Sequence, residues 1–282
     1  MKKSLLWLLA LLFLLPCLPA SAAEAPPPCE LPENAARYAA YAEAYPELDW
    51  AEVVLHVNLR LDYPNYEGIL YAQRPDGIAV FVNKHYKLPK TYKPEDLVKV
   101  AGHYSSKTVQ LRAVCYDAFL LMAADAEAAG LDLYISSGYR VNKKSGGADS
   151  IWFAWPGHSE HQTGLAFDLR KRGPTLARLG DYHYQDTREY KWLGENAHLY
   201  GFIESYPKGS SGLTGFGFEP WHWRYVGVTI ASDMKNKGFS TYHEYWATYL
   251  VRRAWYAEEE VATSMPRFER VVPPLRGQYL SE

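Results

Sequence analysis

Two short segments of the sequence carry side chains that can bind a metal ion. Residues 159–168 read Ser-Glu-His-Gln-Thr-Gly-Leu-Ala-Phe-Asp, and residues 219–223 read Glu-Pro-Trp-His-Trp. Two imidazoles and a carboxylate suit catalytic zinc, which takes three protein ligands and leaves a fourth position for water. The sequence therefore predicts a zinc site made by His161, Asp168 and His222, with ligand atoms within about 4 Å of one another.

Glu219 precedes His222 by three residues, with Pro220 between them. This spacing disfavours binding to the same ion and predicts a carboxylate beside the open metal position. Zinc lowers the pKa of its bound water to about 7, and Glu219 could take a proton from that water and pass it to a departing amine. The ion would also polarise the carbonyl under attack. Without further information, however, a His-x6-Asp spacing is more often structural than metal-binding.

Both segments coincide with predicted strands. One strand is expected over 164–169, directly after His161. Another is expected over 221–226, where alternation sends His222 to one face and its two tryptophan neighbours to the other. Further predicted elements are a helix over 106–129 ended by Gly130, strands over 131–137 and 202–206, a helix over 186–200 with Asp186 and Glu189 in capping-box spacing, and mainly helix from Val228. The fold class predicted is α+β, with a small antiparallel sheet packed by helices.

The pattern Ser-x-His-x-x-Gly-x-Ala-x-Asp followed by Glu-x-x-His is similar to the signature of the VanY-type D-alanyl-D-alanine carboxypeptidases. These belong to a wider group that includes lysostaphin-like peptidases and the hedgehog signalling domain. The likeness extends to Ser-Gly-Tyr-Arg at 137–140 and to segments at 82–97, 191–209 and 224–227, so it spans roughly Trp50 to Gly238. Matches of this kind in the right order strengthen one another.

The resemblance implies zinc at His161, Asp168 and His222, with Glu219 as the base. It also gives Arg140 a role at the substrate, where a guanidinium suits a terminal carboxylate. The alternative for Arg140 is a structural ion pair. Ser159 either donates a hydrogen bond to substrate or only shapes the turn before His161.

The sequence departs from the family pattern near the expected peptide pocket. Residues 141–155 are short, rich in Gly and Ser and without Gln, where relatives usually carry a helix with a substrate-facing Gln. Ser205 stands where relatives often carry Arg. Both departures concern peptide specificity and leave the chemistry intact.

The resemblance implies a D,D-carboxypeptidase that removes terminal D-Ala from peptidoglycan stem peptides or their precursors. An L,D-carboxypeptidase that acts on tetrapeptide stems is the close alternative. A zinc-bearing cell-wall binding module without activity is a third hypothesis, and Glu219 argues against it because a binding site needs no base. The formal net charge of −2 argues against a nucleic-acid partner.

The first residues indicate export. Lys2 and Lys3 precede an apolar run and an Ala-x-Ala site, so residues 1–22 are predicted to be a signal peptide cleaved after Ala22 or Ala23. The enzyme would then work outside the cytoplasm, with no later membrane span. Lipid attachment at Cys17 is the alternative. We further predict a leader over 23–49, the peptidase domain over 50–238 and a helical extension over 239–282.

The two cysteines after the signal peptide and the remaining histidines are predicted to have mainly structural roles. Cys29 and Cys115 could form a disulfide in an exported protein, but a helical core position for Cys115 is favoured. His158 could support the metal ligands. The other histidines are predicted to be surface or packing residues; they are His56, His85, His103, His183, His198 and His243.

Overall fold

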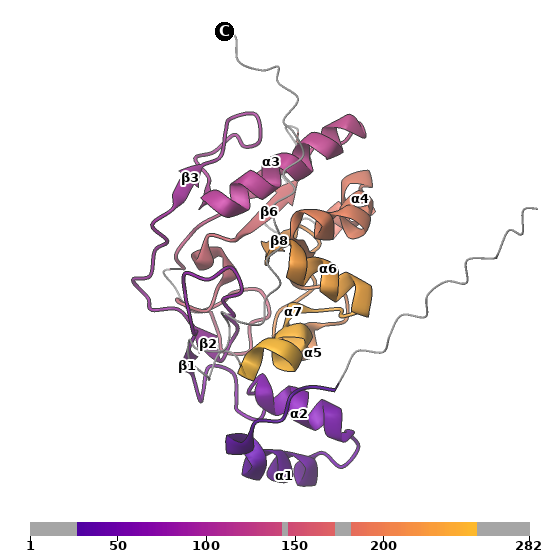
Figure 1. The fold of residues 1–282 in the computed structure, drawn as a ribbon. Coiled ribbons are helices and arrows are strands. Elements are labelled where there is room, and N and C mark those ends of the chain that lie inside the picture. The colour runs from indigo at the N-terminus through magenta and orange to yellow at the C-terminus, as the bar shows by residue number, and fades with distance from the viewer. Residues whose placement is uncertain (1–26, 143–145, 173–181, 253–282) are drawn as a thin grey trace, which may run out of the picture.

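The computed structural model describes residues 27–142, 146–172 and 182–252 (Figure 1). Its centre is a four-stranded antiparallel sheet in the order β5-β6-β8-β7. These strands are β5 (Tyr134–Ser137), β6 (Ala166–Arg170), β7 (Phe202–Glu204) and β8 (His222–Tyr225). The predicted α+β class with a small antiparallel sheet is confirmed.

One face of the sheet is apolar. Phe167 and Leu169 of β6 lie in the main core cluster with Trp223 of β8. Helix α3 (Ala113–Ala128) covers this face, and the ring of Phe119 meets Phe167 edge-on at 5.3 Å (Figure 1). Because side chains alternate along a strand, Asp168 is directed to the opposite face. The sheet thus separates the core beneath α3 from a polar site on its other side.

The remaining elements surround the sheet. Two small two-stranded ladders are parallel β1 (Leu70–Tyr71) with β2 (Tyr86–Lys87) and antiparallel β3 (Leu97–Lys99) with β4 (Gln110–Arg112). The helices are α1 (Ala35–Ala44), α2 (Trp50–Asn58), α4 (Arg188–Asn196), α5 (Ser211–Thr214), α6 (Val228–Lys237) and α7 (Tyr242–Tyr245), which a π-helical turn (Trp246–Leu250) continues. Short 3-10 turns cover 32–34, 160–163, 182–186 and 197–200.

The two N-terminal helices pack together at one end of the molecule (Figure 1). Tyr38 of α1 is buried against Val53, Val54 and Val57 of α2. The predicted boundary between leader and domain, at residues 49 and 50, therefore falls between two helices in contact. At the other terminus, Trp246 stacks on Phe81 at 4.3 Å. Of the predicted extension, residues 239–252 are described; 242–252 are helical, and Trp246 packs against the domain.

Two element predictions are wrong in detail. The long helix begins at Ala113 rather than at residue 106, because residues 110–112 instead form β4 against β3. The helix expected over 186–200 starts after Thr187, whose hydroxyl accepts the Tyr190 N–H at 3.1 Å. Glu189 makes no capping box and pairs with Lys171 at 2.7 Å. Threonine and aspartate are both good caps, so adjacent candidates are hard to separate by sequence.

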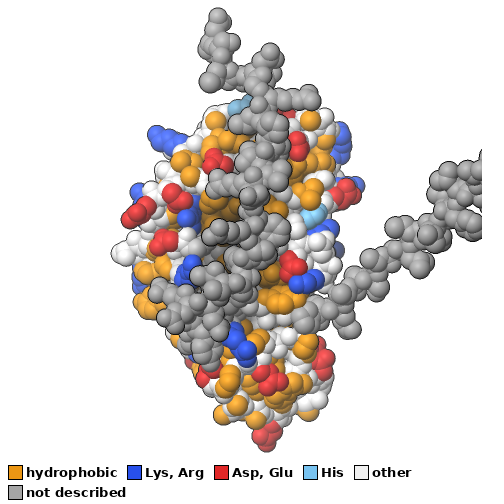
Figure 2. All heavy atoms as spheres, in the orientation of Figure 1, with side chains coloured by type: hydrophobic (Ala, Val, Ile, Leu, Met, Phe, Trp, Pro, Cys, Tyr) orange, Lys and Arg blue, Asp and Glu red, His pale blue; other side chains and the backbone are white. Residues whose placement is uncertain are grey.

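Several other predictions concern cysteines, charge and membrane spans. Cys29 and Cys115 are free thiols, and Cys115 is buried as expected for a core position. On the face shown in Figure 2, basic and acidic side chains are interspersed among hydrophobic ones. Among the described residues, no helix combines the length and hydropathy needed to cross a membrane. The predicted signal peptide, 1–22, lies outside the described residues.

Candidate metal centre

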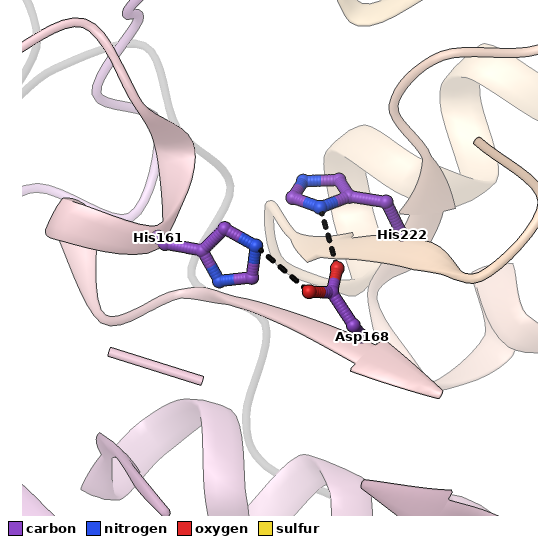
Figure 3. A group of neighbouring side chains, drawn as sticks. All are labelled: His161, Asp168 and His222. Atoms are coloured by element: carbon purple, nitrogen blue, oxygen red, sulfur yellow. Dashed lines mark hydrogen bonds and ion pairs between the residues drawn. The ribbon is translucent and has the colours of Figure 1, made fainter. Parts of the chain in front are cut away.

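The three predicted metal ligands converge on the polar face of the sheet. Asp168 lies between the two imidazoles and directs one carboxylate oxygen to each (Figure 3). Its Oδ2 is 3.2 Å from His161 Nε2, and its Oδ1 is 3.0 Å from His222 Nδ1. No two of the three ligand atoms are more than 4.8 Å apart, and all three residues are buried. The spacing is slightly wider than the 4 Å expected from the sequence.

Strand register places Asp168 and His222 together. The two residues are directly opposite each other in the antiparallel pair of β6 and β8. Directly paired residues have Cβ atoms about 5 Å apart and share one face of the sheet. A register slip of one residue would turn either side chain to the opposite face.

His161 reaches the site from a turn rather than a strand. It lies in the 3-10 turn Glu160–Thr163, which ends at Gly164 with a left-handed φ of 70°. A side chain at Gly164 would be strained by that φ and would lie 2.8 Å from Arg112 Cγ, so glycine is required there. The chain then enters β6, which carries Asp168 seven residues after His161.

The outward nitrogens of both imidazoles have fixed partners. His161 Nδ1 lies 2.8 Å from the carbonyl oxygen of Gly138, and His222 Nε2 lies 3.0 Å from Glu160 Oε2. Both partners are acceptors, so each ring donates its N–H away from the site. The nitrogens that face Asp168 are thereby left to bind a metal, as is usual for metal-binding histidines.

Residue 138 packs closely against β4, which explains why it is a glycine. A Cβ at Gly138 would lie 2.6 Å from the carbonyl oxygen of Gln110. The Ser-Gly-Tyr-Arg segment therefore contributes a backbone carbonyl to the site. The sequence pattern pointed to this segment but predicted no role for its glycine.

Burial and charge set the protonation of the ligands. Burial lowers the pKa of His161, although the charge of Asp168 opposes this. Burial would raise the pKa of Asp168, but the two imidazoles outweigh it and hold the pKa well below its usual range. For His222, the hydrogen bonds to Asp168 and Glu160 outweigh burial and raise the pKa to about 10. A cation at Nδ1 of His222 would therefore compete with a proton.

Glu219 lies beside this cluster. Its Oε2 is 3.8 Å from His222 Nδ1, and its side chain is 15% exposed. Burial raises the pKa of Glu219 to about 7, although His222 opposes the shift. A carboxyl with a pKa near the working pH can both accept and return a proton.

The two predicted substrate residues differ in exposure. Arg140 is exposed and contacts the side-chain oxygen of Asn142. Its charge helps to lower the pKa of His161 and opposes the rise in the pKa of Glu219. Ser159 is 6% exposed, and its hydroxyl makes no hydrogen bond within the described ranges. The geometry thus places both residues near the site without assigning either a ligand.

The described part of the loop that departs from the family pattern contacts Gly217, two residues before Glu219. The carbonyl of Ile151 accepts the N–H of Gly217 at 2.9 Å. The ring of Trp152 covers Gly217 so closely that a Cβ there would lie 2.4 Å from it. Trp152 and Phe153 are 44% and 66% exposed. Residues 146–155 therefore form an aromatic edge near the site.

Glu160, which is buried within the signature, was not predicted as a site residue from the sequence. Its carboxylate contacts His222 and also accepts a hydrogen bond from Ser205 at 2.6 Å. One feature of the sequence could have pointed to Glu160: it is the only acidic residue of the signature segment before Asp168. His158 instead binds the carbonyl of Asn83 at 2.8 Å, and the structure shows no contact between His158 and the three ligands among the described residues.

The donor set fits zinc. Two imidazole nitrogens and one carboxylate oxygen are typical ligands of catalytic zinc, and both imidazoles have acceptors on their outer nitrogens. Tetrahedral zinc separates its ligand atoms by about 3.5 Å, so the most widely separated ligand atoms, at most 4.8 Å apart, would have to approach by about 1 Å.

Comparison with protein families supports this assignment. Residues 108–228 match the family model for VanY, D-alanyl-D-alanine carboxypeptidase. The putative carboxypeptidase YodJ of Bacillus subtilis is 35% identical over 201 residues, which cover 66% of this chain and 72% of that protein. VanXYC of Enterococcus gallinarum, a bifunctional D-Ala-D-Ala dipeptidase and D-Ala-D-Ala carboxypeptidase, is 30% identical over 59% of this chain and 93% of its own length.

A solved structure is similar as well. The LdcB LD-carboxypeptidase superposes with a TM-score of 0.56 and 33% sequence identity. The match covers 64% of this chain and 91% of that chain. The peptidase fold expected from the sequence is confirmed by this similarity.

Zinc binding should release about one proton at about pH 8. There His222 carries a proton that the metal must displace, His161 is neutral, and Glu219 is mostly ionised. Zinc affinity should therefore rise about tenfold per pH unit below the His222 pKa of about 10. Isothermal titration calorimetry in buffers of different ionisation enthalpy measures the release. No proton release, with affinity independent of pH, would contradict the binding of zinc at His222 Nδ1.

Proposed function

The chain belongs to the VanY family of D-alanyl-D-alanine carboxypeptidases, and from this premise we propose that it removes the terminal D-alanine of peptidoglycan stem peptides or their precursors. The activity is that of a zinc-dependent D,D-carboxypeptidase. The observation that carries the proposal is the buried group of His161, Asp168 and His222 with Glu219 at its edge. A binding module without activity would not need a buried carboxyl whose pKa is raised to about 7.

We propose a role for each site residue. His161, Asp168 and His222 hold zinc, which when bound supplies Lewis acidity toward the scissile carbonyl and a water of lowered pKa. Glu219 accepts a proton from the attacking water as the water oxygen bonds to the carbonyl carbon. When the C–N bond breaks, Glu219 returns this proton to the amine nitrogen of the departing D-alanine.

Arg140 and Ser159 are proposed to bind the peptide. Arg140 is exposed at the rim, where its guanidinium can hold the terminal carboxylate in a bidentate pair. Ser159 precedes the ligand His161 and has a hydroxyl without a partner among the described residues, so it can bind the peptide backbone. The exposed Trp152 and Phe153 lie next to the segment of Glu219 and would contact the preceding part of the stem.

The second candidate is an L,D-carboxypeptidase that acts on tetrapeptide stems. The similarity to the LdcB LD-carboxypeptidase favours it. Both reactions use the same metal ligands and base, so the difference would lie in the pocket that receives the penultimate residue. Residues 146–155 contact the segment that leads to Glu219, where we expect that pocket. Ser205, in contrast, is buried and donates to Glu160, so its departure from the family pattern does not bear on the pocket.

Synthetic stem peptides test the function directly. We expect the purified protein to release one D-alanine from a pentapeptide stem faster than from a tetrapeptide stem, measured by quantifying free D-alanine. A chelator should abolish release, and added zinc should restore it. Preference for the tetrapeptide would favour the L,D alternative. Zinc binding without hydrolysis of either stem would favour the binding module.

Glu219→Gln should separate chemistry from metal binding. Glutamine keeps the size of the side chain but cannot accept a proton from water. We expect turnover to fall by about 10²- to 10⁴-fold, with zinc content near that of the unmodified protein, because Glu219 is not proposed as a ligand. In the matched variant His222→Ala, metal and activity should be lost together. Near-normal turnover of Glu219→Gln, or loss of its zinc, would contradict the assigned role.

Export is proposed from the N-terminal sequence. Lys2 and Lys3, the apolar run and the Ala-x-Ala site together have the form of a signal peptide, and peptidoglycan lies outside the cytoplasm. The mature chain is expected to start near Ala23. N-terminal sequencing of secreted protein measures this. An acylated Cys17 at the terminus would instead indicate a lipoprotein.

A further inference from the structure

Glu160 is a buried carboxylate to which the proposed reaction gives no part. It begins the 3-10 turn that carries His161, and its side chain is 3% exposed. Its Oε2 lies 3.0 Å from His222 Nε2, while His222 Nδ1 lies 3.0 Å from Asp168. The imidazole of His222 is thus held at both nitrogens, with Glu160 on the side away from the metal position.

This contact determines which nitrogen of His222 can bind metal. A metal binds the imidazole of His222 only after displacing one of its protons, and the neutral ring then carries one N–H and presents a lone pair at its other nitrogen. An ionised carboxylate only accepts hydrogen bonds, so it requires the N–H at Nε2 and leaves the lone pair at Nδ1. That is the nitrogen directed toward Asp168 and the metal position.

Two neighbours keep Glu160 ionised and oriented. The Ser205 hydroxyl donates to Oε2 at 2.6 Å, and Arg224 Nη1 lies 3.8 Å from Oε1. A hydroxyl donor and a guanidinium thus face the carboxylate, which leaves it to act as an acceptor toward His222 Nε2.

Arg224 is itself fixed by the backbone. Its side chain is fully buried, and its Nη2 donates to the carbonyl oxygens of Ile78 and Val80 at 3.0 and 2.9 Å. The guanidinium therefore cannot swing away from Glu160 without leaving donors unpaired in the core. Glu160 is held from the side of β8 by Arg224 and from the end of β7 by Ser205.

We propose that Glu160 is a positioning residue of the metal centre: it holds the His222 ring with Nδ1 toward the metal, and Ser205 holds Glu160. The inference rests on the proposed zinc ligands but not on the substrate. Removing such a partner of a metal-binding histidine typically lowers metal affinity by about 10- to 100-fold.

Zinc affinity is the test, measured by competition with a chromophoric chelator. Glu160→Ala should weaken zinc binding by about 10- to 100-fold. Glu160→Gln keeps an oxygen acceptor and should lose less, and Ser205→Ala should weaken binding less than Glu160→Ala does. At limiting zinc the activity of Glu160→Ala should fall, and saturating zinc should restore most of it, because Glu160 does not touch the substrate.

Glu189→Ala is the matched control. Glu189 is as buried as Glu160 and pairs with Lys171, but in the described structure it contacts none of the three metal ligands. Its loss should lower stability without changing zinc affinity. A Glu160→Ala protein that binds zinc within about twofold of the unmodified protein would overturn the proposal. So would activity losses that excess zinc does not repair.

The remaining outcomes are also decisive. If Glu160→Ala does not fold, unchanged zinc affinity in both Glu160→Gln and Ser205→Ala overturns the proposal, and a fall in both supports it. If the unmodified protein binds zinc but cleaves no stem peptide, the proposed function fails while the zinc series still tests Glu160. If the unmodified protein binds no zinc, the metal assignment and this inference fall together.

Discussion

The antiparallel pairing of β6 with β8 is the constraint on which the site depends. It places Asp168 directly opposite His222 and, on the other face, directs Phe167 and Trp223 into the core under α3. A slip of one residue would bury the two polar side chains beneath α3 and turn the aromatic rings outward. The apolar core therefore enforces the register, and the register in turn brings the metal-binding side chains together.

Burying several ionisable groups on one face is costly unless each has a partner. His222 lies between Asp168 and Glu160, and Glu160 lies between His222 and Arg224. Positively charged groups and carboxylates thus alternate through the site, and each contact offsets part of the cost of burying the two groups that make it. Such a network also fixes orientations, because moving one member leaves its neighbours unsatisfied. The partners that make the burial tolerable are the ones that orient the rings.

The sequence predicted the metal ligands and the base, but not the residues that hold the ligands in place. The two signature segments were sufficient to identify three residues that converge in the fold, His161, Asp168 and His222. Such motifs can be read from the sequence because each is short and continuous. Glu160 was missed, since its contact with His222 crosses 62 positions of the chain. The helix start at Ala113 was missed because residues 110–112 pair with β3 across a loop instead of extending the helix. Local patterns do not contain pairings of this kind.

The position of Glu219 shows how burial can serve both structure and reaction. A carboxyl this close to Asp168 and Glu160 is disfavoured in its charged form, and burial raises its pKa to about 7. Positive charge at the metal position would draw that pKa down. With its pKa lowered, Glu219 would be ionised at neutral pH and able to accept a proton from water, whereas Asp168, held by two imidazoles, stays ionised throughout. Two carboxylates on one site thus acquire different roles from their surroundings alone, one as a fixed ligand and one as a carrier of protons.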